Sequence, residues 1–156
     1  MKKAIISLVL VLALAGLASA TQYSVDFTTA FALNASATKV NVSDFTSVVV
    51  SIPANVTKGI LITTFARAAG SGSLAAAFYF QVSYDNGTTW ADYVDPVTGL
   101  EYVAVLTGHG VIATTTVRVA NFINLGGITN IRLAKVINND SGNNLTAVNA
   151  SISFTY

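Results

Sequence analysis

The end of the chain carries an unbroken alternation of apolar and polar residues. From Val148 to Tyr156 every second side chain is apolar, and those between are Asn, Ser or Thr. Successive side chains of a β-strand point to opposite faces, so this pattern predicts a long strand with one buried face. A second such segment begins near the start, where one parity is shared by Tyr23, Val25, Phe27, Phe31 and Leu33.

Similar segments occur along the whole chain, separated by turn-forming residues such as Asp85-Asn86-Gly87 and Gly126-Gly127. The sequence therefore predicts an all-β fold, a single two-sheet β-sandwich of jelly-roll or immunoglobulin-like type with about eight strands. The absence of cysteine removes the core disulfide of an immunoglobulin domain and favours the jelly roll. The predicted strands are Tyr23–Leu33, Thr46–Ile52, Gly59–Ala69, Ser73–Tyr84, Glu101–Leu106, Val111–Phe122, Asn130–Ile137 and Leu145–Tyr156.

The first 20 residues have the features of a secretory signal peptide. Lys2 and Lys3 precede the apolar run Ile5–Leu17, which is followed by the small residues Ala18-Ser19-Ala20. The run is shorter than the roughly 20 residues of a membrane span. We therefore expect export and cleavage after residue 20. The mature chain would divide into an N-terminal strand, 21–34, and a sandwich body, 35–156.

Charge is scarce and nearly balanced. Without Lys2 and Lys3 the eight basic residues become six, against seven acidic ones, so the exported chain carries a net charge of about −1. This balance excludes a basic surface for nucleic acid. Charged residues make up only 10% of the chain, and so little charge favours self-association.

The residue types needed for catalysis are poorly represented. The one histidine, His109, lies in Gly108-His109-Gly110, a pattern that predicts an exposed hairpin tip. Without cysteine a Cys-His pair is ruled out, a zinc site is poorly supplied, and no Gly-x-Ser-x-Gly elbow is present. We therefore expect no enzymatic activity.

Four acidic residues lie close together in the sequence: Asp85, Asp92, Asp95 and Glu101. Carboxylates crowded on a loop are typical calcium ligands, so calcium is the one cofactor to consider. The alternative is that turns simply favour Asp. No Asp-x-Asp-x-Asp-Gly loop is present, and this alternative is the stronger of the two.

Seven Asn-x-Ser/Thr sequons occur, more than the two or three that chance would give. They indicate N-glycosylation of an exported surface protein, although a surface rich in Ser, Thr and Asn generates sequons by itself. Asn149 lies inside the last strand and is the least suitable acceptor. The other six are Asn34, Asn41, Asn55, Asn86, Asn139 and Asn144.

Three aromatic residues near the acidic loop, Trp90, Tyr93 and Tyr102, are candidates for stacking on a sugar ring. For Trp90 the competing interpretation is a turn-covering side chain, since it follows Asp85-Asn86-Gly87 as in the Asp-Gly-x-x-Trp turn of many secreted β-sandwiches. These residues are the basis of a second functional hypothesis, a secreted carbohydrate-binding or adhesin module that acts as a monomer.

A terminal alternating strand can complete its own sheet, close a membrane β-barrel, or pair with an open edge of another subunit. The barrel is the weakest hypothesis, because continuous apolar runs such as Val48-Val49-Val50 suit a dry sandwich interior. In its pattern the chain resembles the subunits of extracellular filaments assembled by donor-strand exchange, the chaperone–usher pilins and the archaeal surface threads. The resemblance rests on Tyr23–Leu33, the all-β body and the final strand Ile152–Tyr156.

This resemblance implies a sandwich whose groove accepts the N-terminal strand of the next subunit. Tyr23, Val25, Phe27, Phe31 and Leu33 would then be the groove-filling side chains. Because chaperone–usher pilins usually carry a disulfide, the cysteine-free chain fits the archaeal type better. The leading hypothesis is therefore a non-enzymatic subunit of a cell-surface filament, with copies of itself as partners and surface glycans as further candidates.

Overall fold

The computed structural model describes residues 22–40, 44–67, 76–96, 99, 101–103 and 116–155. The predicted signal segment, Asn41, His109 and Tyr156 lie outside these ranges. All regular structure in the described residues is strand, and none of them belongs to a helix able to cross a membrane.

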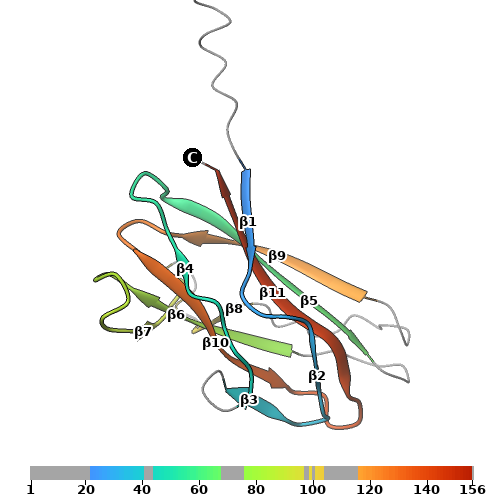
Figure 1. The fold of residues 1–156 in the computed structure, drawn as a ribbon. Helices are drawn as coiled ribbons and strands as arrows, with labels where there is room; N and C mark the ends of the chain where they lie inside the picture. Colours follow the sequence, from blue (N-terminus) through green and yellow to red (C-terminus); the bar gives the residue numbers. More distant parts are fainter. Residues whose placement is uncertain are drawn as a thin grey trace, which may run out of the picture.

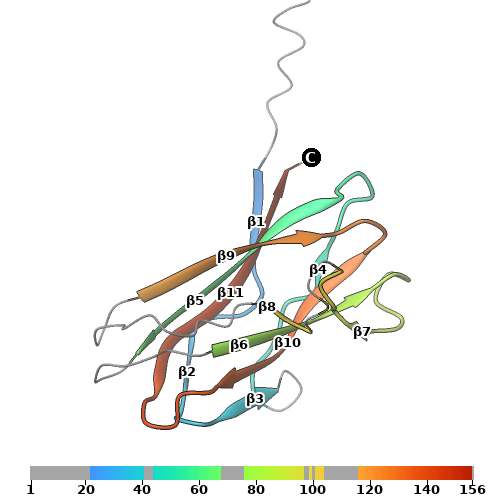
Figure 2. The same ribbon diagram turned by 180° about the vertical axis from the view of Figure 1, so that it is seen from behind.

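Within the described ranges, eleven strands form two antiparallel sheets, which confirms the predicted β-sandwich (Figures 1 and 2). Sheet A has the order β1-β11-β5-β9, with β2 also paired to β11, and sheet B has the order β3-β10-β6-β7, with β4 on β10 and β8 on β6. The strands are β1 (Gln22–Asp26), β2 (Phe31–Leu33), β3 (Thr38–Val40), β4 (Val50–Ser51), β5 (Lys58–Arg67), β6 (Ala76–Ser83), β7 (Ala91–Asp92), β8 (Tyr102–Val103), β9 (Thr116–Asn124), β10 (Asn130–Asn138) and β11 (Leu145–Thr155).

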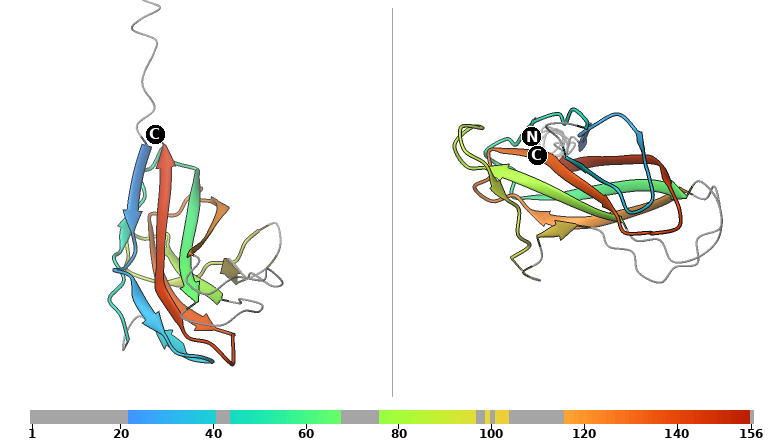
Figure 3. Two further views of the ribbon diagram at one scale, coloured as in Figure 1. Left: turned by 90° about the vertical axis from the view of Figure 1, so that its right-hand side faces the viewer. Right: turned by 90° about the horizontal axis from the view of Figure 1, so that it is seen from below.

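The core lies between the two layers, which Figure 3 shows from the side. Aromatic rings from opposite sheets meet there: Phe65 of β5 packs on Phe78 of β6 with ring centroids 6.1 Å apart. Both side chains are completely buried. Contacts of this kind add about 0.5–1.5 kcal/mol beyond the apolar area that they bury.

The last strand, β11, occupies the interior of sheet A and is bent by a β-bulge. Its register against β5 and β2 shifts between Leu145 and Asn149. Ala147 has a positive φ of 51°, which lets one residue stand out of the ladder. Because of the bulge, Leu145 and Val148 both face the core although they are three residues apart.

Two predicted strands differ from the structure. The segment Tyr23–Leu33 is interrupted after Asp26, and only two residues of the predicted Thr46–Ile52 form a strand. Next to that strand, the N–H of Leu133 donates to the hydroxyl of Ser47 (2.9 Å). Apolar alternation does not reveal such a bond between a side chain and the backbone. The short strands β3 and β7 were not predicted.

Candidate functional site

The N-terminal segment lies along one border of sheet A, as two short strands on the same side of β11 (Figure 1). β1 pairs with the second half of β11, from Gln22 opposite Thr155 to Asp26 opposite Ser151. β2 pairs with the first half, where Phe31 lies opposite Val148. In the single chain, this segment therefore completes the sandwich of its own molecule.

Phe27 anchors the segment just beyond β1. Its side chain is completely buried, and its ring lies 5.3 Å from that of Phe80 in sheet B. Its backbone N–H donates to the carbonyl of Ala150 (2.8 Å), and its carbonyl accepts from the N–H of Val48. Burying a side chain of this size stabilises a fold by about 1.5–3 kcal/mol.

The two large apolar residues of β2 differ in how deeply they are buried. Leu33 is completely buried in the core, whereas Phe31 is half-buried. The Phe31 ring stacks on Phe45 at 5.3 Å, and the ammonium of Lys39 lies 5.1 Å from the Phe31 ring centre. These contacts place Phe31 at the rim of the sandwich.

β1 itself is mostly exposed. Tyr23 is 45% exposed and touches Phe154 at a ring distance of 5.3 Å, and Val25 is half-buried. Besides the ladder, the Gln22 amide donates to the Ser153 hydroxyl (3.0 Å). Of the five predicted polymerisation residues, then, Phe27 and Leu33 lie deep in the fold, whereas Tyr23 is almost half exposed.

The turn between β6 and β7 is built around Asp85. The carboxylate accepts hydrogen bonds from the Thr89 N–H (2.8 Å), the Ser83 hydroxyl (2.7 Å) and the Thr89 hydroxyl (2.7 Å). Together they lower the pKa of Asp85 from 3.8 to about 2. Gly87 adopts a positive φ of 85°, as this turn requires. The Asp85 carboxylate therefore stabilises the turn through these hydrogen bonds.

The predicted calcium ligands do not gather in one place. Asp92 lies on β7 and accepts from the Gln81 amide (3.0 Å), while Asp85 is engaged in its turn. Within the described ranges, no group of three or more acidic or histidine side chains could hold a metal ion. Asp85 and Asp92 are thus close in the sequence but make separate hydrogen bonds, one within the turn and one to a neighbouring strand.

Trp90 and Tyr93 do not form a shared sugar platform. Trp90 is half-buried, and the Arg132 guanidinium lies 4.1 Å from its ring centre. Tyr93 is only 6% exposed and belongs to the core. Its burial raises the pKa of its phenol. Tyr102 lies on β8, whose side chains are outside the described part.

Five sequon asparagines are exposed and lie in connections between strands: Asn34, Asn55, Asn86, Asn139 and Asn144. The β2–β3 and β10–β11 connections touch, since the Ala35 N–H donates to Asn144 Oδ1 (2.9 Å). Asn149 differs from the five, because it is half-buried within β11 and its amide oxygen accepts from the Ala150 N–H (2.7 Å).

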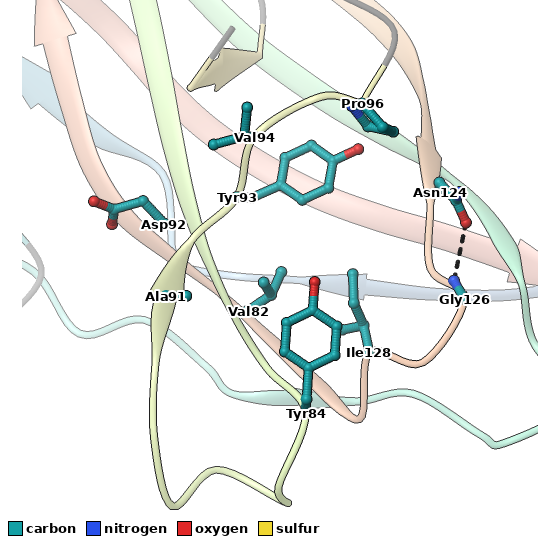
Figure 4. Close-up of a pocket in the computed structure, with 10 residues that line it drawn as sticks. All are labelled: Val82, Tyr84, Ala91, Asp92, Tyr93, Val94, Pro96, Asn124, Gly126 and Ile128. Carbon is teal, nitrogen blue, oxygen red and sulfur yellow. Dashed lines mark hydrogen bonds between the residues drawn. The ribbon is translucent and has the colours of Figure 1, made fainter. Parts of the chain in front are cut away.

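A cavity of about 290 Å³ opens between β7 and the β9–β10 turn (Figure 4). Its lining is largely aliphatic and aromatic, and its one carboxylate, Asp92, points away from the rings of Tyr84 and Tyr93. Asn124 accepts from the Gly126 N–H (3.0 Å) and so closes the turn. The lining offers no nucleophile paired with a base.

One exposed side chain was missed by the sequence analysis. Phe122 is 87% exposed on the outer face of β9. The predicted strand Val111–Phe122 ends at this residue, whereas β9 continues to Asn124 and Ile123 is buried. Extending the parity of Val117 and Val119 to Ile123 would have placed Phe122 on the outside.

No protein-family model matches the chain, and no curated protein matches its sequence. In structure it is similar to a chain of infectious bursal disease virus, Gt strain, with a TM-score of 0.51 and 13% identity over 88% of this chain. The match covers 32% of the viral chain, so this chain spans about a third of that length. This likeness shows a common fold.

Two further structures align over most of their length but with low scores. The SPBc2 prophage-derived protein YomS gives a TM-score of 0.41 at 11% identity, covering 87% of this chain and 94% of that one. A subunit of Bacillus endospore appendages, described as disulfide-linked pili, gives 0.33 at 14% identity, covering 88% and 93%. Scores this low carry no argument about fold or function.

Proposed function

We propose that this protein is a non-catalytic structural subunit of an extracellular filament, and that it polymerises by exchanging its N-terminal strand with a neighbouring copy. The observation that carries this proposal is the position of β1. It is an exposed border strand beside β11, joined to the rest of the chain through the short connection Thr28–Ala30.

Exchange needs no new contacts. A β1 strand from a neighbouring copy would meet the same ladder on β11, and its Phe27 would fill the same site beside Phe80. The free energies of the two forms, with β1 in its own molecule or in a neighbouring copy, therefore differ mainly through the strain of the connection and the local concentration of the strand. If the rotation between copies does not close, exchange continues into an open filament.

The sequence pattern supports the same function. The alternation of Tyr23, Val25 and Phe27 is typical of a donated strand, and the predicted signal peptide would export the chain. The exposed sequon asparagines in the connections are proposed glycosylation sites of such a surface protein.

A reversible lock tests the exchange. Ser24 lies directly opposite Ser153 in the β1–β11 ladder, and the chain has no cysteine of its own. Directly opposed Cβ atoms are about 4.5–5.5 Å apart, near enough for a disulfide after small adjustments. The variant Ser24→Cys/Ser153→Cys, oxidised as a monomer, should not polymerise until a reductant is added.

Negative-stain microscopy and size-exclusion chromatography would follow the polymers. Deletion of residues 21–27 should abolish them, and the single variant Ser24→Cys should polymerise like the wild type. If the oxidised, locked monomer forms filaments as readily as its reduced form, strand exchange is the wrong mechanism. Wild-type protein that stays monomeric under all these conditions would refute the filament itself.

A further inference from the structure

The opposite border of sheet A is formed by β9, which pairs with β5 residue by residue, from Thr116 opposite Ala66 to Asn124 opposite Lys58 (Figure 2). Within the described part of the chain, nothing pairs with its other side. The border of nine residues contains no proline and no bulge, and it carries one charge, Arg118. Proteins usually protect long border strands with prolines, bulges or several charges, because an open ladder invites pairing.

Several apolar side chains of β9 are exposed or only half-buried in the single chain. On the outer face Phe122 is 87% exposed, next to the half-buried Ile60 of β5. On the inner face Val117 and Val119 are only half-buried. Exposed apolar residues beside an unpaired ladder mark a surface that another molecule can cover.

The sequence of β9 is complementary to itself when it is read antiparallel about Ala120. In that register all nine residues have partners, and Arg118 lies opposite Phe122 of the partner subunit on the outer face. A guanidinium over an aromatic ring is a favourable pair, and the two-fold symmetry supplies it twice. On the inner face Val117 would meet Ile123 of the partner subunit, a pair of apolar side chains.

We propose that two copies of this chain associate through β9, antiparallel and centred on Ala120, so that sheet A continues from one subunit into the next. This contact is separate from the strand exchange proposed for β1, because it uses the other border of the sheet. A filament held by both contacts would have lateral as well as longitudinal connections. The contact does not depend on strand exchange, so the oxidised Ser24→Cys/Ser153→Cys chain, which keeps β1 in its own molecule, should still form the dimer.

Cysteine crosslinking tests the register on a cysteine-free background. Ala120→Cys should crosslink to itself, because the two-fold axis passes beside this residue. Arg118→Cys and Phe122→Cys should each fail alone, since four residues along a ladder separate equal positions by about 14 Å. An equal mixture of these two variants should crosslink. Efficient crosslinking of Arg118→Cys alone would overturn the register.

Charge changes at Phe122 test the contact itself. Phe122→Lys places a like charge opposite Arg118 at two symmetric positions and should weaken dimerisation by about tenfold or more. The matched variant Phe122→Glu offers an ion pair instead and should retain the dimer. Sedimentation equilibrium up to about 1 mM would measure both, which covers the weak end of specific association. A monomer throughout, or equal dimerisation of both variants, would overturn the proposal.

Discussion

The two borders of sheet A end the same sheet in different ways. At one border, two short strands share β11, and the completely buried side chains of Phe27 and Leu33 tie them to the core. At the other border, β9 runs unbroken for nine residues and exposes Phe122. The first border depends on apolar anchoring, and the second is regular and open. The short strand β1 could therefore be exchanged between molecules as a unit. The long strand β9 could instead be extended by the pairing of another strand.

The largest expected effect tests the anchoring of the first border. Phe27→Ala removes a completely buried ring and should lower the free energy of unfolding by about 3–5 kcal/mol. Phe122→Ala, at the other border, removes a ring that is 87% exposed and should change it by less than about 0.5 kcal/mol. Urea denaturation of monomeric protein measures both. Similar losses in the two variants would remove the contrast between the borders.

A smaller change in the free energy of unfolding is expected from a substitution on β5. This strand is adjacent to β9 and is separated from β1 by β11. Thr63 is completely buried, opposite Ala150 of β11 and Val119 of β9, and its hydroxyl has no hydrogen-bond partner. Thr63→Val keeps the shape and removes the unpartnered hydroxyl, so it should raise the free energy of unfolding by about 1 kcal/mol. The same change at Thr64, which is half-buried on the outer face, serves as the control and should have little effect.

If Thr63→Val instead destabilises the protein, a partner for this hydroxyl exists in the folded chain. The buried hydroxyl beside β9 would then have a hydrogen-bond partner, and the two borders of sheet A would differ less. Thermal unfolding of the two valine variants, recorded side by side, distinguishes these outcomes.

The smallest effect lies on sheet B, away from both borders, and concerns pH. Asp85 has its pKa lowered from 3.8 to about 2 by the hydrogen bonds of its turn. A lowered folded-state pKa means that the charged form stabilises the fold above pH 3.8, and that this contribution is lost as the pH falls toward 2. Asp85→Asn should therefore flatten the acid side of the stability profile, measured by urea unfolding between these values. Parallel acid profiles of variant and wild type would contradict this role.

Much of the fold was predictable, because alternation reports directly which residues share a face. The parity of Val148, Ala150 and Ile152 correctly predicted their burial in β11. Alternation says nothing about lateral position in a sheet. Tyr23 has the same parity as Phe27 but is 45% exposed, because β1 lies at a border.

The candidate sites were less predictable for a related reason. Trp90 and Tyr93 are three residues apart on either side of β7, an odd spacing that sends them to opposite faces of sheet B. Only knowledge that residues 91 and 92 form a strand would have revealed this separation. Asp85 and Asp92 were grouped by proximity in the sequence, whereas the hydrogen bonds of a turn and of a neighbouring strand occupy them separately. The strand-exchange role of β1 stays a prediction.

Gln22 and Thr155 stand opposite each other in the β1–β11 ladder. A loop of a few residues could therefore join these two positions into a tight hairpin, and the turn at the exposed Asn86 offers a place to open the backbone instead. In such a circular permutant β1 would be tethered at both ends, so swapping it between molecules would require threading a closed loop.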